Sequence, residues 1–457
     1  MTTLVRHRLP IVPLAALGVA IVAVLGLRLL GSLPARDQLG LDEPLLDAPA
    51  GAVTAVSAVD ELDQARSDVS FWAARLTAQP GDLVAATQLA GADLADARLT
   101  GDVTAYVRAE GAVEAALHAQ PAYAPALTLR AGILVSLHRF PEARDLATTI
   151  LAHIPDDPTA LGVLGDASTE LGDLATATKA YRALVAANDG AAAQVRIGRL
   201  DFVTGDVPGA LVADRAAAAD ASDEGLVGTP LAFYSVTLGD ALLATGDAAG
   251  ARAAYTDALA VRTDLPSALV GLARIDAFTG NLDAAVAKMD TAIAAIPLPD
   301  SLARRADLEA LRNGPGDAAR ATADLATVGA IAKLAGDAAY LYDRGTALFL
   351  SDHGLDPTRA VTLASDELAI RKDVYGYDAL AWALLNAGRA ADADAPMRSA
   401  LAVGTPDARL WYHAGLIAAA NHRPDEARSD LTRALALGPA LDTVSRSRAL
   451  AALATLP

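Results

Sequence analysis

The stretch ATGDAAGARAAYTDALAV, residues 244–261, decides the fold because a related stretch follows it at a fixed distance. Thirty-four residues later the chain reads FTGNLDAAVAKMDTAIAA, residues 278–295. Each stretch has a break, Gly246-Asp247 or Gly280-Asn281, and then a run rich in alanine, the best helix former. Self-similarity at such a period is typical of repeat architectures.

A three-position template extends the similarity along the chain. A small residue is followed twelve positions later by alanine, and seven positions after that by a small or apolar residue. The template occurs at Ala131/Ala143/Ile150, Gly165/Ala177/Leu184, Gly198/Ala210/Ala217, Gly239/Ala251/Ala258, Ala273/Ala285/Ala292, Ala381/Ala393/Ala400 and Gly415/Ala427/Ala434.

Turn-forming residues recur in register with this template. Glycine stands five residues before the template alanine at Gly172, Gly205, Gly246, Gly280 and Gly388, and Asp or Asn follows four of these glycines. A glycine can end a helix in the left-handed conformation, and the Asp or Asn after it can cap the next helix. Each unit is therefore predicted to be a helix, a tight turn, a second helix and a short loop, with small residues where the two helices cross.

This pattern resembles the tetratricopeptide repeat, a 34-residue helix–turn–helix unit. The resemblance covers most of residues 83–437 and is strongest at 266–297 and 376–439. It implies an all-α solenoid of about ten units over residues 58–457, wound as a right-handed superhelix, with the clearest repeats at 124–297 and 374–439. A leading helix is expected near 58–79 and a capping helix at 441–456.

Two segments depart from the template. Gly205 and Gly246 are separated by 41 residues, and the surplus is assigned to an extended loop in ADASDEGLVGTP, residues 219–230. Residues 300–371 keep a helical rhythm but lose the template.

The N-terminus predicts a membrane anchor. Residues 1–8 include Arg6 and Arg8, and residues 9–27 carry no charge over a length that can cross a bilayer. We therefore expect a transmembrane helix at 9–31, a cytoplasmic segment at 1–8, a flexible linker at 32–57 and the repeats outside the cytoplasmic membrane, because basic residues precede the apolar run. A cleaved signal peptide is the alternative, and it would also export the repeats.

Composition limits the partners. The chain has 457 residues, a net charge of −18 and no cysteine. An acidic surface repels phosphate backbones, so nucleic-acid binding is not expected. Without cysteine, disulfides, Cys-zinc sites and thiol catalysis are excluded. The partner is expected to be a protein or peptide segment that is apolar or basic.

The resemblance also implies where that segment would bind. Tetratricopeptide arrays mostly bind peptides on the concave side, which the first helix of each unit lines. The candidate groove residues are the aromatic, polar and charged residues on that face of the later units: Tyr342, Thr346, Phe349, Asp378, Trp382, Asn386, Arg409, Tyr412 and His413. The alternative for the aromatic residues is packing against the next unit. The basic residues Arg196, Arg199 and Arg274 of the middle units are expected to pair with nearby aspartates.

The sequence offers little for catalysis or for metal and cofactor binding. The seven histidines form no ligand motif, and GPGD at 314–317 lacks the lysine of a phosphate loop. No G-x-S-x-G motif is present. We therefore expect a non-enzymatic interaction scaffold or assembly factor without metal or cofactor. The alternatives are a structural spacer or self-assembling module and, less favoured, a small-ligand carrier or enzyme.

Overall fold

The computed structural model describes residues 58–334 and 343–457, and in this part of the chain it contains 22 α-helices and no strand. The helices are α2 (Ala58–Ala78), α3 (Leu83–Thr100), α4 (Val103–Ala119), α5 (Ala124–Ser136), α6 (Phe140–His153), α7 (Pro158–Glu170), α8 (Leu174–Ala187), α9 (Ala191–Thr204), α10 (Val207–Asp223), α11 (Gly228–Ala244), α12 (Ala248–Val261), α13 (Pro266–Phe278), α14 (Leu282–Ala295), α15 (Pro299–Arg312), α16 (Asp317–Leu334), α17 (Asp343–Asp352), α18 (Pro357–Ile370), α19 (Val374–Asn386), α20 (Ala390–Leu401), α21 (Ala408–Ala420), α22 (Pro424–Ala436) and α23 (Thr443–Thr455), with a short 3-10 helix, η4 (Gly438–Ala440), before the last.

The helices from α3 to α22 form ten successive pairs, with α2 before them and α23 after them. The predicted all-helical solenoid is therefore confirmed, and pairs continue through residues 300–371, where the template is lost. The expected anchor at 9–31 and linker at 32–57 lie outside the described residues. Among the helices of the described part, none combines the length and the apolar character that crossing a membrane requires.

The turns inside the pairs follow the predicted chemistry. Gly172, Gly205, Gly246, Gly280 and Gly388 all have φ between 75° and 93°, the left-handed region that glycine adopts without strain. The next residue caps the second helix in four of the five turns: Asp173 accepts from Thr176 N–H, Asp206 from Gly209 N–H, Asp247 from Gly250 N–H and Asn281 from Ala284 N–H.

The template positions are the points where helices cross. All 21 template residues are buried, whichever repeat they belong to. The ring of Tyr255 fills the space between them, and a Cβ at Gly239 would lie 2.6 Å from its Cε1 atom. A Cβ at Gly271, on the next pair, would also overlap the same ring. One tyrosine therefore fixes the crossing within its own pair and the contact with the following pair.

The expected extended loop at 219–230 is wrong over much of its length. Helix α10 continues to Asp223, and α11 begins at Gly228, so only residues 224–227 connect the two helices. Alanine dominates the end of α10, and its high helix propensity explains why the surplus residues lengthen the helix.

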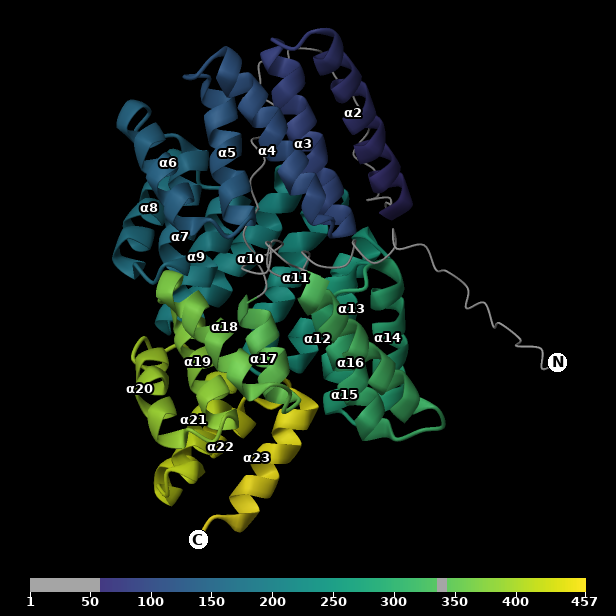
Figure 1. Ribbon diagram of the computed structural model, residues 1–457, viewed down its shortest axis with the longest axis vertical. Helices are drawn as coiled ribbons and strands as arrows, with labels where there is room; N and C mark the ends of the chain where they lie inside the picture. The colour runs from purple at the N-terminus through teal and green to yellow at the C-terminus, as the bar shows by residue number, and fades with distance from the viewer. Residues whose placement is uncertain (1–57, 335–342) are drawn as a thin grey trace, which may run out of the picture.

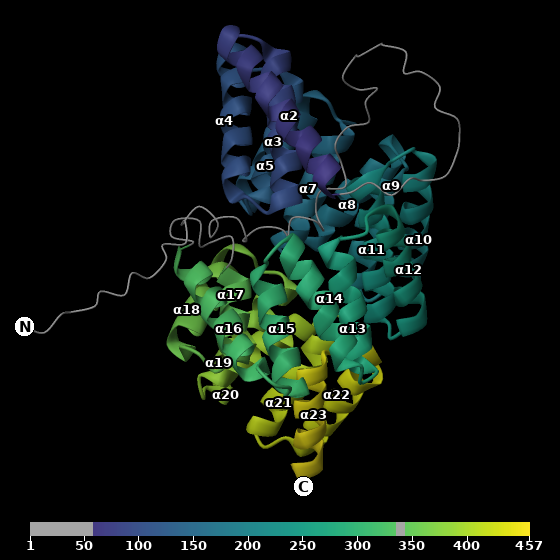
Figure 2. The same cartoon turned by 90° about the vertical axis from the view of Figure 1, so that its right-hand side faces the viewer.

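The array coils so that later repeats return beside earlier ones (Figure 1 and Figure 2). The ends of α7, α9, α11 and α13 meet three loops, at residues 371–373, 404–405 and 437–440. We call this line of contact the inter-turn seam. At the start of the array, Thr229 N–H of α11 donates to Glu61 Oε1 of α2 at 2.6 Å, a contact between residues 168 positions apart.

One repeat has an acid where its neighbours have a large packing residue. Asp214 follows Ala210 by four positions, as Tyr255 follows Ala251, and its side chain is 4% exposed. Its Oδ1 atom, which faces Gly198, has no hydrogen-bond partner. Burial, together with the charges of Asp240 and Asp201, raises the pKa of Asp214 to about 7.

We predict that Gly239→Ala destabilises the protein and that Gly91→Ala does not. The new methyl group at 239 must displace the buried Tyr255 ring, which costs about 1–3 kcal/mol. Gly91 lies inside α3, and a Cβ there meets nothing within 4 Å, so alanine should add up to about 1 kcal/mol of helix stability. Urea unfolding of both variants measures the difference. Equal effects would mean that the close crossing at Tyr255 does not constrain the fold.

We predict that Asp214→Asn stabilises the protein at neutral pH. Because the pKa is raised on folding, the folded state keeps a proton that the unfolded state has lost, and stability falls as the pH rises from about 4 to about 7. The asparagine variant should gain up to about 4 kcal/mol at pH 7 and almost nothing at pH 4. Thermal unfolding across this range is the measurement, with exposed Asp257→Asn as the control. A pH-independent gain would contradict the assignment.

Candidate functional site

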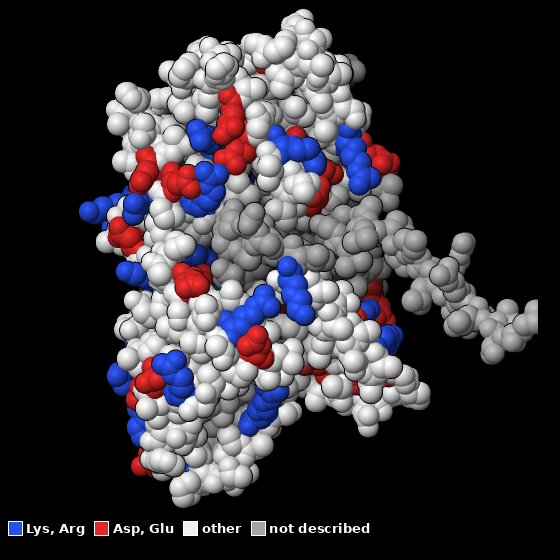
Figure 3. Space-filling view, in the orientation of Figure 1, with Lys and Arg blue, Asp and Glu red and all other residues white. Residues whose placement is uncertain are grey.

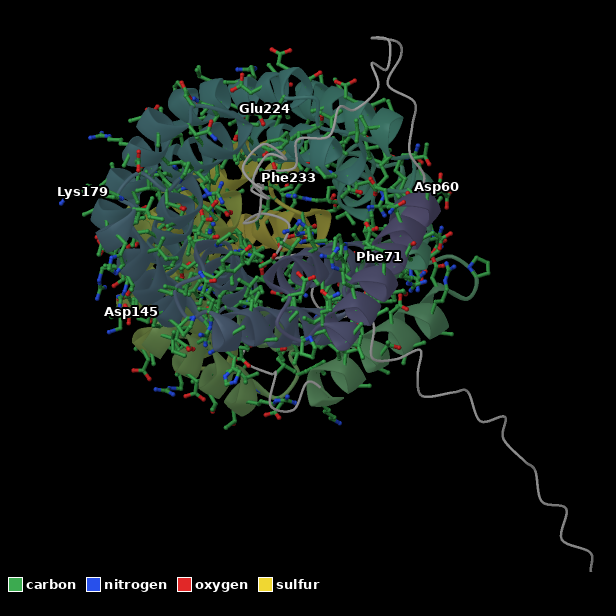
Figure 4. All side chains as sticks on the ribbon, turned by 90° about the horizontal axis from the view of Figure 1, so that it is seen from above. Asp60, Phe71, Asp145, Lys179, Glu224 and Phe233 are labelled. Atoms are coloured by element: carbon green, nitrogen blue, oxygen red, sulfur yellow. The ribbon has the colours of Figure 1, made fainter. Side chains whose placement is uncertain are left out.

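The first helices of the pairs line the inside of the coil. Helices α5, α7, α9, α11 and α13 contact one another in sequence, and so do α17, α19 and α21. Viewed from above, the coil is ring-shaped, with Phe233 of α11 on the inside and with Asp145 of α6 and Lys179 of α8 on the outer rim (Figure 4). The second helices therefore form the outer wall, and the inner face is the surface on which the predicted groove residues can be placed.

The structure buries several of the predicted groove residues. Asp378, Trp382, Tyr412 and His413 have exposures of 0%, 3%, 1% and 2%. Phe349 of α17 is 8% exposed and packs among apolar residues of α16, α18 and α19. Thr346 and Arg409 are partly buried, Asn386 is exposed, and Tyr342 lies outside the described residues.

Trp382, Tyr412 and His413 form an aromatic cluster between α19 and α21. The rings of Trp382 and His413 are stacked with centroids 4.0 Å apart, and Tyr412 lies 5.6 Å from Trp382. Asp378 Oδ1 lies 2.7 Å from His413 Nδ1, and Trp382 Nε1 donates to Asp352 Oδ1 of α17 at 2.8 Å. These contacts join the first helices of three successive pairs.

The two carboxylates of the aromatic cluster differ in their electrostatics. Burial alone would raise the pKa of Asp378, but the neighbouring His413 and Arg409 hold that pKa below its usual value. Desolvation by the surrounding inner face raises the pKa of Asp352 above its usual value even though the residue is exposed, and His413 and the Trp382 hydrogen bond act in the opposite direction. A His–Asp pair can serve in acid–base chemistry. Here both side chains are almost fully covered, so the pair is better suited to holding helices together.

The closing helix explains why these residues are covered. Trp382 and Tyr412 belong to one apolar cluster with Leu441 and Ala449, and Leu453 packs against it. The last unit of a solenoid needs such a cover, because its apolar face has no following repeat. Burial favours the packing alternative for the aromatic residues. Whether any of them contacts a partner stays a prediction.

A second group of inner residues is charged and at least partly accessible. We call Arg274 of α13, Asp300 and Arg304 of α15 and Arg409 of α21 the inner charge cluster. Arg304 Nε donates to Asp300 Oδ2 at 2.7 Å, and their side chains are 36% and 48% exposed. Partial desolvation by the surrounding protein would raise the pKa of Asp300, but Arg304, Arg274 and Arg409 together lower that pKa. Charges from three pairs in different parts of the sequence thus influence one another on the inner face, and Arg409 Nε also lies 3.5 Å from Asp378 Oδ2.

Sequence reasoning found part of the inner charge cluster. Arg409 was a predicted groove residue, whereas Asp300 and Arg304 lie where the template is lost, so no register marked them as inner residues. The expected pairing with aspartates holds for Arg196, whose Nη2 atom lies 2.9 Å from Asp166 Oδ2. Arg199 pairs with Glu170 instead. Arg274 Nη2 donates to the backbone carbonyl oxygen of Ala440 at 3.0 Å.

The outside of the molecule carries both signs of charge. On the face in Figure 3, basic and acidic side chains are interspersed, although the whole chain has a net charge of −18. In the two described ranges, no group of three or more His, Asp or Glu residues is arranged to hold a metal ion.

Comparison with known families identifies the repeats. Residues 133–192, 236–298 and 379–442 match the family model described as Tetratricopeptide repeat. The prediction of tetratricopeptide repeats is therefore confirmed for these three stretches, which together cover less than half of the chain. No curated protein matches the chain.

Several solved structures are similar to this chain at low sequence identity and low TM-score. A tetratricopeptide repeat protein from Parabacteroides merdae is 19% identical, with 59% of this chain and 100% of that chain covered and a TM-score of 0.32. Yeast Tom70 is 14% identical, with 86% and 95% covered and a TM-score of 0.34. Cut9 with Hcn1, from the APC/C, is 15% identical, with 87% and 95% covered and a TM-score of 0.32.

We predict that Trp382→Ala strongly destabilises the protein, whereas Asn386→Ala does not. Removing a buried aromatic side chain from the aromatic cluster should cost about 3–5 kcal/mol. Asn386 lies on the same helix but is exposed, so its replacement should change stability by less than about 0.5 kcal/mol. Urea unfolding distinguishes the two. A Trp382→Ala variant of unchanged stability would return this residue to the list of partner-binding candidates.

Proposed function

We propose that this protein is a non-enzymatic interaction scaffold that binds a protein or peptide segment on the inner face of its repeat coil. The observation that carries the proposal is the inner charge cluster, in which partly accessible charges from α13, α15 and α21 influence one another on the inner face. Such convergence of separate repeats is what an extended segment needs in order to contact several repeats at once.

The composition of the inner charge cluster suggests what it selects. Guanidinium groups can donate several hydrogen bonds in a fixed geometry, and Asp300 supplies an acceptor between them. A segment with polar or acidic side chains, or with free backbone carbonyl groups, matches this surface better than the apolar or basic segment that the net charge of the whole chain suggests. Arg274 already makes such a bond to a backbone carbonyl group of this chain, at Ala440.

The location is also part of the proposal. The apolar run at residues 9–31, preceded by Arg6 and Arg8, supports a single-pass anchor that leaves the repeats outside the cytoplasmic membrane. The linker at 32–57 would then tether the scaffold to the outer face of that membrane. If the N-terminal segment is cleaved, the same scaffold is exported without a tether.

Site-specific photocrosslinking in cells tests the scaffold. With a photoreactive residue at Asn386, on a first helix, the full-length chain should give one or a few discrete crosslinked partners. The same probe at Lys179, on the outer rim, should not capture them (Figure 4). Arg304→Ala should weaken the crosslink from Asn386 several-fold without unfolding the protein, because Arg304 is partly exposed.

The outcomes separate the parts of the proposal. Equal crosslinking from both positions, or none from Asn386, would contradict an inner binding face, and crosslinks only between copies of this chain would favour a self-assembling module. Deleting residues 9–31 should remove the protein from the membrane fraction. Continued sedimentation with the membrane would contradict the anchor but not the inner binding face.

A further inference from the structure

The inter-turn seam repeats the same backbone contact three times. Gly172, Gly205 and Gly246 lie in successive turns inside helix pairs, and each meets a backbone carbonyl group one coil later. A Cβ at Gly172 would collide with the carbonyl oxygen of Lys372. Cβ atoms at Gly205 and Gly246 would lie 3.0 Å and 3.3 Å from the carbonyl oxygens of Gly404 and Leu437. The lack of a Cβ at these glycines therefore allows both the left-handed turn and the close contact with the next coil.

Two other turns provide an internal comparison. Gly280 and Gly388 occupy the same position in their pairs and have φ values of 84° and 75°, but a Cβ at either position meets nothing within 4 Å. The left-handed turn and the contact across the seam are thus separable within one chain.

Polar contacts accompany each of the three backbone contacts of the seam, which we number from the first, at the 371–373 loop, to the third, at the 437–440 loop. Glu170, at the end of α7, accepts from Arg199 of its own coil and from Arg371 of the next. Thr405 Oγ1 donates to the carbonyl oxygen of Val203 at 2.5 Å. At the third contact, Arg274 Nη2 donates to the carbonyl oxygen of Ala440.

The charges around Glu170 are mostly buried, and their signs balance. Glu170 and Arg371 are 2% and 6% exposed, and Arg344 and Glu367 are buried beside them. The group comprises three guanidinium groups and three carboxylates: Arg199, Arg344 and Arg371 with Glu170, Glu367 and Asp373. Buried ion pairs of this kind contribute little net stability, because desolvation offsets the attraction, but they are costly to leave unpaired. These ion pairs therefore determine the relative position of the two coils more than they stabilise the contact between them.

The apolar contact across the seam is small by comparison. Val203 and Leu174 of the earlier coil pack with Val374 of the later one. Neighbouring repeats within a coil share much larger cores, such as the cluster that extends from Ala191 to Ile275. Beside Arg199, Lys372 and Tyr377, a small cleft of about 50 Å³ lies along the seam. The apolar contact across the seam is therefore less extensive than the contact between stacked repeats.

We propose that the inter-turn seam is a reversible latch that controls access to the inner face. With the seam closed, adjacent coils touch and a partner segment cannot enter between them. Opening it separates the loops at 371–373, 404–405 and 437–440 from α7, α9, α11 and α13 while each repeat stays folded. Arg274 is then released from Ala440 and can bind a partner instead. This regulation rests on the proposed function, since it concerns the same inner face.

The absence of cysteine makes the latch directly measurable. Spin labels at Lys179→Cys on α8 and Arg398→Cys on α20, both exposed, lie on repeats that meet across the seam. Dipolar spectroscopy on the full chain should give one short distance for the closed form. Gly172→Ala should add a second, longer distance, because its Cβ pushes the 371–373 loop away. Gly280→Ala has the same turn strain without the seam contact and should keep the single distance.

A second pair of variants distinguishes opening of the seam from general loss of stability. Glu170→Gln removes the charge that bridges two coils, whereas Glu309→Gln removes an equally buried charge that pairs with Arg320 inside one helix pair. Both should lower the unfolding midpoint, but only Glu170→Gln should add the longer distance. If the two variants within each matched pair give the same distance distribution, the proposal of a latch is contradicted.

The functional consequence has its own readout. Gly172→Ala should increase photocrosslinking from Asn386 severalfold relative to Gly280→Ala. A longer spin-label distance without that increase would overturn the control of access and leave the scaffold proposal standing. Failure of the crosslink in every background, with the distance change still present, would contradict the scaffold and not the seam.

Discussion

Two helices can cross closely only where one of them presents no large side chain, and the units that carry the template depend on that constraint. The Tyr255 ring lies against both Gly239 and Gly271, so a single side chain needs two positions without Cβ. Tyr181 uses Gly165 in the same way, and Leu431 uses Gly415. Because the small residue and the large one are on different helices, neither can vary alone. The period of the sequence is a consequence of this paired requirement.

The features that the sequence predicts are those decided within one unit or between neighbours. Gly246 and Asp247 act on adjacent backbone groups, and the template alanines act across one helix crossing. His138 and His422 also adopt the left-handed turn, with φ of 55° and 59°, where the other units have glycine. Such local requirements select the same residue types at a fixed spacing in the sequence. This is why the helix pairs could be predicted from the template, and why pairs without it, at α15 to α18, could be expected only as helical segments.

The features that the sequence did not predict depend on distant parts of the chain. Trp382 and Tyr412 have the composition of a binding surface, but α23 and its apolar neighbours cover them. Their burial depends on where the last helix packs, and no periodicity specifies that. The partner of Arg199 was expected to be an aspartate and is Glu170, which also binds Arg371, 201 residues further along the chain. The inner charge cluster is likewise assembled by coiling, from repeats that differ in sequence.

Coiling with contact between coils changes how the repeats depend on one another. In an open solenoid each repeat touches only its neighbours, and stability is close to a sum of local terms. Here Glu170 of α7 needs Arg371, and Val203 of α9 accepts a hydrogen bond from Thr405, so the middle repeats are complete only when the later ones have docked. A buried carboxylate without its guanidinium partner is unfavourable. Loss of the later coil therefore weakens the middle repeats as well, although their own helix crossings are intact. When the coils separate, water hydrates both partners of each polar contact, so breaking these contacts costs little free energy. Leaving one partner buried alone costs much more. The polar contacts can therefore fix the geometry of the closed coil and still allow it to open.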